Sequence, residues 1–231
     1  GLRSLKTLTL HSKIALSATA LLIVLGAAGV WIFEHDNPLT LGALPLGQQL
    51  QAALFQSVTT RTAGFATVPQ ENLRNPTALL SLLLMFIGGS PVGTAGGVKT
   101  VTVVVLATSA LAAIRNKRDT VLFHRTVPRQ AVAKAVAVTG MSFAICFLST
   151  LLLSAAADAN ALDILYEAVS ATATVGLTRG LTPTLSAWGK LIIIVTMYLG
   201  RVGPISLAIV FGTRRQSENL IKEPTEEISV G

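Results

Sequence analysis

The sequence predicts an all-α membrane protein made of two repeats, each with a long apolar helix, a short re-entrant helix, a small-residue loop and a broken second helix. The first observation is the composition: 51% of the residues are hydrophobic and 13% are charged, whereas charged residues make up roughly 25% of a typical soluble domain. The second is a set of long apolar stretches. The third is a Thr-x-Gly motif that occurs at the same place in each half of the chain.

The apolar stretches are long enough to cross a bilayer, which takes about 20 residues of helix. Among them they carry only three charged side chains, Lys99, Lys190 and Arg201. The single cysteine, Cys146, also lies in one of them, where we expect it to pack rather than to form a disulfide. The stretches are residues 14–33, 77–114, 135–157 and 188–212.

The net charge of +7 is a signal of topology rather than of nucleic-acid binding, because most of the basic residues lie between the apolar stretches or beyond them. Basic residues mark the cytoplasmic side of a membrane protein. We therefore expect a multi-pass protein of the cell membrane with its N-terminal flank, the 115–134 loop and its C-terminal tail in the cytoplasm. Twelve of the 18 Lys and Arg residues lie there: Arg3, Lys6, Lys13, Arg115, Lys117, Arg118, Arg125, Arg129, Lys134, Arg214, Arg215 and Lys222.

Each of the two outer connections contains a short apolar segment, residues 46–58 and residues 161–171. These segments are too short to span a bilayer and are typical of re-entrant helices. Each is followed by a Thr-x-Gly loop, and Gly64 aligns with Gly176 at a constant offset along the chain. The pattern predicts two repeats, residues 1–118 and 119–231, as in other membrane proteins with internal repeats.

The second apolar stretch of each repeat is interrupted in its middle. Residues 88–97 contain five glycines and a proline, and residues 200–204 read Gly-Arg-Val-Gly-Pro. Such sequences do not favour a continuous helix. Irregular backbone at mid-membrane depth occurs only where it is buried in protein or lines a water-filled cavity.

A loop behind a re-entrant helix can direct successive backbone carbonyls toward one axis, where they replace the water around a dehydrated cation. Glycine permits the required dihedral angles, and threonine adds a hydroxyl. We therefore predict an ion filter whose ligands are the carbonyls of Thr62, Ala63, Gly64, Thr174, Val175 and Gly176. Acidic residues near the two loops are either simply solvated, which is the usual state of scattered outer acids, or concentrate cations at the mouth: Glu34, Asp36, Asp158, Asp163 and Glu167.

Four motifs carry a family resemblance, and they occur in family order over nearly the whole chain. The sequence resembles the Trk/Ktr/HKT potassium transporter superfamily and is most similar to the Ktr-type membrane subunit. The motifs are Thr-Thr-Arg-Thr-Ala-Gly-Phe at 59–65, Gly-Gly-Ser-Pro-Val-Gly-Thr-Ala-Gly-Gly-Val-Lys-Thr at 88–100, Thr-Val-Gly-Leu at 174–177 with Gly-Leu-Thr-Pro at 180–183, and Gly-Arg-Val-Gly-Pro at 200–204.

The resemblance implies a potassium-channel-like pore built from four M1–pore helix–M2 repeats, of which this chain corresponds to the third and fourth. We therefore expect the C-terminal half of a longer polypeptide that binds K⁺ as the transported ion, with Na⁺ as a further candidate, and needs no cofactor. The family also implies a homodimer in membrane lipid, regulated by a cytosolic ring of nucleotide-binding subunits. One departure is the sequence Ala171-Thr-Ala before Thr174, where an aromatic residue and a glycine are expected.

The family further implies that the glycine-rich segment is a movable gate beneath the filter, with Arg201 opposing the passage of cations. A static helix break and a structural arginine are the alternatives. Arg61 is expected to brace the first loop, and Lys99 either to anchor the gate or to control it. The predicted gate consists of Gly88, Gly89, Ser90, Pro91, Gly93, Thr94, Ala95, Gly96, Gly97 and Arg201.

No motif in the sequence is typical of a catalytic triad, a metal cluster or a nucleotide-binding site, so we predict that the protein is not an enzyme. Two other functions are compatible with the pattern. The broken helices are also typical of a secondary transporter that binds an organic solute at the midplane. A non-conducting membrane scaffold is the other alternative. The 115–134 loop, with His124, is expected to contact anionic lipid or the regulatory ring.

Overall fold

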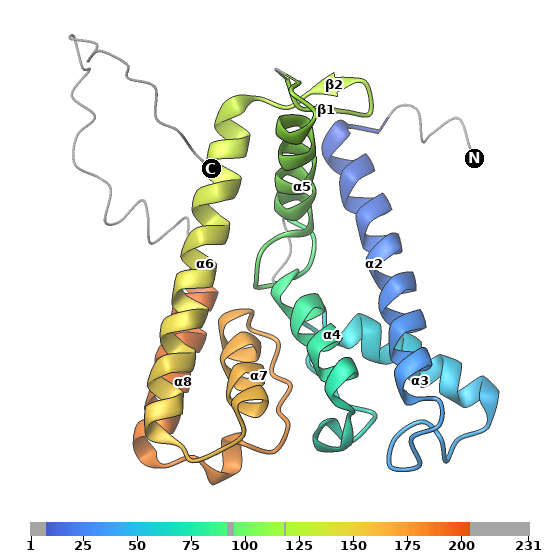
Figure 1. The fold of residues 1–231 in the computed structure, drawn as a ribbon, viewed down its shortest axis with the longest axis vertical. Coiled ribbons are helices and arrows are strands. Elements are labelled where there is room, and N and C mark those ends of the chain that lie inside the picture. The colour runs from blue at the N-terminus through green and yellow to red at the C-terminus, as the bar shows by residue number, and fades with distance from the viewer. Residues whose placement is uncertain (1–7, 92–94, 118, 204–231) are drawn as a thin grey trace.

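The structure is a computed structural model that describes residues 8–91, 95–117 and 119–203; these form seven α-helices, two 3-10 turns and one short β-hairpin (Figure 1). The first half contains α2 (Leu10–Glu34), α3 (Leu46–Thr59), η1 (Gln70–Asn72), α4 (Asn75–Phe86) and α5 (Thr100–Ile114). The second contains β1 (Val121–Leu122), β2 (Arg125–Thr126), α6 (Arg129–Ala156), α7 (Ala161–Thr172), η2 (Thr182–Thr184) and α8 (Ala187–Val202). The fold is all-α apart from the hairpin.

Polar caps and proline fix the starts of several helices. The Thr9 hydroxyl accepts a hydrogen bond from the Ser12 N–H at the start of α2. The Asn160 and Ser186 side chains do the same at the starts of α7 and α8. Pro76 occupies the first turn of α4, where a missing N–H costs nothing. These side chains satisfy backbone donors that would otherwise lack partners.

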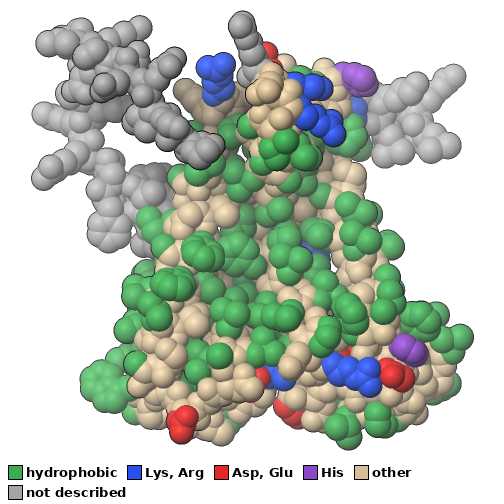
Figure 2. Space-filling model, viewed as in Figure 1, with side chains coloured by type: hydrophobic (Ala, Val, Ile, Leu, Met, Phe, Trp, Pro, Cys, Tyr) green, Lys and Arg blue, Asp and Glu red, His purple; other side chains and the backbone are tan. Residues whose placement is uncertain are grey.

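Two helices of the described chain, α2 and α6, are long and apolar enough to cross a membrane. The helices α4 and α5 are also apolar but shorter, because the second stretch of the first half is interrupted between them. Figure 2 shows hydrophobic side chains along the length of the molecule and charged side chains mostly toward its two ends. This distribution is typical of a membrane protein.

The long helices α2 and α6 and the shorter α5 run along the longest axis, and α3, α4 and α7 gather in the half of the molecule away from the hairpin (Figure 1). Helix α7 lies in the interior and packs against α4, α6 and α8. Its Tyr166 and Val169 share a buried cluster with Ala78 and Met85 of α4 and with Cys146 of α6. Cys146 is thus a packed, free cysteine, as predicted.

The re-entrant helices predicted at 46–58 and 161–171 are present as α3 and α7, each one residue longer than predicted. The interruption predicted over 88–97 is also present, since α4 ends at Phe86 and α5 begins at Thr100. The β-hairpin within the 115–134 loop was not predicted. Two predicted gate residues, Gly93 and Thr94, lie outside the described residues, as do the C-terminal tail and the start of the N-terminal flank.

The second interruption was predicted over residues 200–204, and α8 does end within that range, although it continues through Gly200 and Arg201 to Val202. The helix ends at Gly203, which has φ 84° and whose N–H donates to the Leu199 carbonyl. A glycine inside a helix is tolerated when packing requires a small residue. Gly200 meets that condition, because a Cβ there would overlap the Thr172 carbonyl oxygen at the end of α7.

Candidate functional site

The two Thr-x-Gly loops leave the ends of α3 and α7 with the same unusual backbone. Thr62 has φ 72° and Gly64 has φ 79°, while the aligned Thr174 and Gly176 have φ 53° and φ 96°. A positive φ is an outlier for a β-branched residue such as threonine, and such strain is concentrated at functional sites. The residue between each pair, Ala63 or Val175, is not among the residues with a positive φ. The two loops therefore share one backbone pattern at aligned positions.

A hydroxyl at the end of the preceding helix braces each loop. Thr59 Oγ1 accepts a hydrogen bond of 2.8 Å from the Phe65 N–H, and Ser170 Oγ accepts one of 3.2 Å from the Gly176 N–H. The loop N–H groups are thus directed back toward the helix. Within the described part of the chain, no group donates a hydrogen bond to the carbonyl oxygens of Thr62, Ala63, Gly64, Thr174, Val175 or Gly176.

The two loops meet, although they are far apart in sequence. A Cβ placed on Gly64 would overlap the carbonyl oxygen of Val175. Only a glycine therefore allows this close approach, and its φ of 79° also disfavours any other residue. The fold brings both groups of predicted filter residues to one place.

The segment between α4 and α5 folds back on itself and packs against the start of the second loop. Ile87 and Val98 pair in a parallel bridge, and the Val98 N–H donates to the Phe86 carbonyl at 3.0 Å. A Cβ on Gly96 would overlap both the Thr174 hydroxyl and the Ala173 carbonyl oxygen. The described part of the predicted gate is therefore in direct contact with the second loop.

Arg61 braces the first loop against the interrupted helix, as predicted. Its Nη2 donates to the Thr100 hydroxyl at 2.8 Å and to the Gly88 carbonyl at 3.3 Å, and its Nη1 donates to the Thr19 carbonyl at 3.3 Å. Gly88 and Thr100 are the two ends of the interruption. One guanidinium thus holds both ends beside α2.

Lys99 immediately precedes α5, and Arg201 lies in the last turn of α8. The Lys99 ammonium donates a hydrogen bond to the Ala95 carbonyl within the interruption, and Arg201 in the last turn of α8 repels it. Lys99 therefore anchors the interruption, which was one of its two predicted roles. Gly200 packs against the Thr172 carbonyl, so the end of α8 lies close beneath the second loop.

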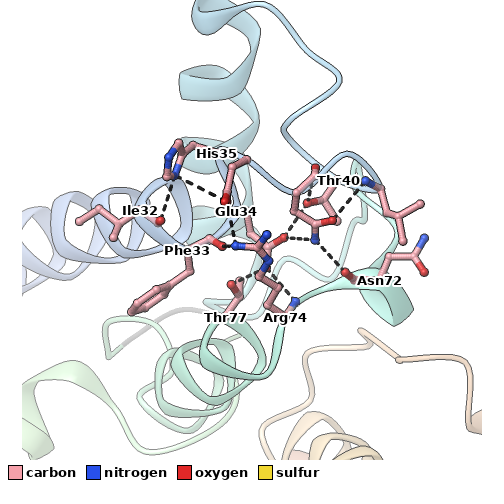
Figure 3. A network of polar contacts seen from close by, with 11 residues as sticks. Ile32, Phe33, Glu34, His35, Thr40, Asn72, Arg74 and Thr77 are labelled. Atoms are coloured by element: carbon pink, nitrogen blue, oxygen red, sulfur yellow. Dashed lines mark hydrogen bonds and ion pairs between the residues drawn. The ribbon is translucent and has the colours of Figure 1, made fainter.

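Glu34 was predicted to lie at the outer surface, either solvated or attracting cations, but the structure buries it completely. Figure 3 shows its polar partners. Its Oε2 accepts hydrogen bonds of 2.6 Å from Asn37 Nδ2 and from the Thr40 hydroxyl. Its Oε1 accepts from the Arg74 N–H at 2.8 Å and from the Thr77 hydroxyl at 2.5 Å. Glu34 therefore caps the start of α4 from the end of α2, and the prediction of a surface charge is wrong.

Three more of the predicted cation-attracting acids are paired within the protein. Glu167 is buried in α7 and accepts hydrogen bonds from two hydroxyls, while Asp163 accepts one from Arg179 at 2.7 Å. Asp36 is exposed and pairs with Arg74 at 2.7 Å, which lowers the pKa of its carboxyl. Asp158 is exposed. Buried carboxylates need such partners to offset the loss of hydration.

The sequence analysis did not predict the side chains that form hydrogen bonds between the first and second halves of the chain. Gln56 and Gln70 exchange hydrogen bonds between their side-chain amides, and the Tyr166 hydroxyl donates to Gln70 Oε1 at 3.1 Å. Tyr166 and Gln70 are 96 residues apart. The only signal in the sequence was that each short apolar helix contains a polar side chain, Gln56 in α3 and Tyr166 in α7. Such a signal does not show which residue that side chain pairs with.

Comparison with known proteins places this chain in a family. The family model described as "TrkH: Cation transport protein" matches residues 3–223. The chain is 42% identical to Ktr system potassium uptake protein B of Bacillus subtilis (strain 168), over 99% of this chain and 51% of that protein. It is 36% identical to the potassium/sodium uptake protein NtpJ of Enterococcus hirae, over 98% of this chain and 51% of that protein.

The fold is also similar to a solved structure, the crystal structure of the potassium transporter TrkH from Vibrio parahaemolyticus. The TM-score is 0.73 at 20% sequence identity, over 87% of this chain and 44% of that chain. The chain spans about half the length of the curated relatives named above. The match of the family model over nearly all residues shows that this chain belongs to the TrkH family of cation transport proteins, a family of transporters and not of enzymes.

Proposed function

We propose that this chain supplies two of the four quarters of a potassium-conducting pore, as the C-terminal half of a longer membrane subunit. The observation that carries the proposal is the matched backbone of the two loops. Thr62 and Thr174 both have a positive φ in spite of their β-branched side chains, and the loop carbonyls accept no hydrogen bond from the described residues. Such carbonyls are the ligands that a dehydrated K⁺ requires.

The proposed gate is the interruption of the second helix, residues 88–97, with Arg201. Its support is the contact of Gly96 with the Thr174 hydroxyl and the position of the α8 end beneath the same loop. A positive charge there would oppose cations that leave the filter toward the cytoplasm. The close relatives named above are potassium or potassium/sodium uptake proteins, which supports K⁺, with Na⁺ as a further candidate, as the transported ion.

The proposed topology places the β-hairpin end in the cytoplasm. Its support is the group of basic side chains around the hairpin, at the end where α2 begins and α5 ends (Figure 2). This end would face anionic lipid and a cytosolic ring of nucleotide-binding subunits. The whole subunit would be a homodimer in the cell membrane, with residues 1–118 and 119–231 as its third and fourth repeats.

Flux measurements on the full-length protein in liposomes test this function. We expect uptake of ⁸⁶Rb⁺ down its gradient, inhibited by unlabelled K⁺, because Rb⁺ has nearly the same size as K⁺. Empty liposomes are the control. Accumulation of an organic solute without Rb⁺ flux would instead support a midplane transporter, and the absence of both fluxes would support a scaffold.

Replacement of Arg201 by alanine in the full-length protein is expected to raise Rb⁺ flux severalfold. A unit charge about 10 Å from a cation repels it by roughly 1–2 kcal/mol at an effective dielectric constant of about 20. The measurement is initial ⁸⁶Rb⁺ uptake per folded protein. Lys190→Ala is the matched control, since Lys190 is an exposed residue in the first turn of the same helix. Equal flux in the Arg201→Ala variant and the unmodified protein would contradict this role.

A further inference from the structure

One largely buried side chain, that of Arg179, joins the two halves on the outer side of the loops. Arg179 follows the second loop, and its side chain is only 9% exposed. Its Nε donates to Asp163 Oδ1 on α7 at 2.7 Å. Its Nη1 donates to the carbonyls of Leu73 at 3.1 Å and Gln70 at 3.4 Å, both in the segment after the first loop. The guanidinium therefore binds one group of the second half and two of the first.

Tyr166 strengthens the same connection. The Arg179 guanidinium lies 6.0 Å from the centre of the Tyr166 ring, and the Tyr166 hydroxyl donates to the Gln70 side chain. Gln70 in turn pairs with Gln56 on α3, the helix that precedes the first loop. The connection thus extends from the helix behind one loop to the helix behind the other.

The second loop has its own outer anchor next to this connection. Glu167, one turn after Asp163 on α7, accepts hydrogen bonds from the hydroxyls of Thr178 and Thr182. At the same offset that aligns Gly64 with Gly176, the first half has Gln51 and Phe55 in place of the two acids. The first half therefore lacks equivalent carboxylates, and its outer segment is held by Arg179 instead.

This asymmetry has a consequence for ion selection. Discrimination between K⁺ and Na⁺ depends on how carbonyl ligands are spaced and how freely they can move. A planar guanidinium with fixed donor directions holds its partners more rigidly than a lysine would. The Arg179 side chain is 9% exposed and the Asp163 side chain 30% exposed, so the pair is only partly screened by water and is harder to separate than an exposed pair.

We propose that the Asp163–Arg179 pair is a selectivity strut, a positioning device that sets the spacing between the two filter quarters and thereby the preference for K⁺ over Na⁺. The strut rests on the proposed function, because it acts on the filter that the two loops would form. Neither side chain is proposed to contact the ion.

The test compares Rb⁺ and Na⁺ fluxes of full-length variants in liposomes. We expect Arg179→Gln to lower the Rb⁺/Na⁺ flux ratio about tenfold. A tenfold change corresponds to about 1.4 kcal/mol, which is close to the free energy of one hydrogen bond to a charged group. We expect Arg179→Lys to lower it less, because it keeps the charge but loses the fork of donors. The charge exchange Asp163→Arg with Arg179→Asp should recover part of the ratio lost in either single variant.

The chain offers a matched control pair at the same end of the molecule. Arg74 and Asp36 are also 2.7 Å apart, but both side chains are exposed, at 44% and 58%. Arg74→Gln should leave the flux ratio unchanged. If Arg179→Gln yields no folded protein, the potassium-dependent rise in melting temperature of Arg179→Lys supplies the second readout, and this rise should be smaller than in the unmodified protein.

The outcomes separate the strut from the function that it serves. If the unmodified protein carries no Rb⁺ flux, the proposed function fails. If the unmodified protein carries Rb⁺ but the ratio is the same in Arg179→Gln and Arg74→Gln, the strut is overturned while the function stands. An unchanged potassium-dependent stabilisation of Arg179→Lys would also overturn it.

Discussion

Replacement of Gly64 by alanine is expected to abolish Rb⁺ uptake by the full-length protein. The new Cβ would overlap the Val175 carbonyl oxygen, which the two loops cannot avoid without moving apart. In addition, the φ of 79° costs an alanine about 1–2 kcal/mol. Because about 1.4 kcal/mol corresponds to a tenfold change in population, strain alone would greatly deplete the native loop. Initial ⁸⁶Rb⁺ uptake in liposomes measures the effect.

Two other glycines separate strain from steric overlap in this experiment. Gly176→Ala places a Cβ in open space but at φ 96°, so it should reduce uptake less than Gly64→Ala. Gly140→Ala, in the middle of α6, also meets open space and should leave uptake unchanged. Normal uptake by the Gly64→Ala variant would exclude the first loop from the conduction path.

Replacement of Glu34 by glutamine is expected to destabilise the protein by about 1–3 kcal/mol, the cost of leaving a buried polar group without its partner. Each carboxylate oxygen of Glu34 accepts from two donors (Figure 3). The side-chain NH₂ of a glutamine would face two donors in either orientation and could accept from neither. Glu34→Leu should be worse, since all four donors would be unpaired. Thermal unfolding of the purified full-length protein measures both variants.

Asp36→Asn is the matched control, because Asp36 is a neighbouring acid whose side chain is 58% exposed. Its loss should change the melting temperature little, as is usual for an exposed ion pair. If Glu34 instead attracted cations, Glu34→Gln would lower Rb⁺ flux at low salt and leave the melting temperature unchanged. That result would contradict the capping role.

The order and length of the helices could be predicted from the sequence because they depend on local properties. Apolar length predicted the long helices, and the short apolar segments predicted α3 and α7 to within one residue. The glycines and proline of residues 88–97 predicted the interruption. In the second half α8 ends at Val202, within the predicted residues 200–204, and Gly200 still belongs to the helix, where its packing against Thr172 requires a glycine.

The roles of the polar side chains could not be predicted in this way, because they depend on partners far away in the sequence. Glu34 reads as an exposed acid at a helix end, yet its partner Thr77 is 43 residues away. Arg179 contacts the Gln70 carbonyl 109 residues away. No periodicity or motif in a single sequence specifies such pairs, whereas burial forces them to form, since an isolated charge away from water is very unfavourable.

The sequence by itself determined that the chain is a helical membrane protein and which short loops contain the candidate ligands. These properties follow from hydrophobicity, chain length and the conformational freedom of glycine, all of which act locally. Only the tertiary structure decided that Gly64 lies against Val175, that Arg61 holds both ends of the interruption, and that Arg179 joins the two halves. The physical reason is that close packing and the pairing of buried polar groups depend on the positions of whole helices.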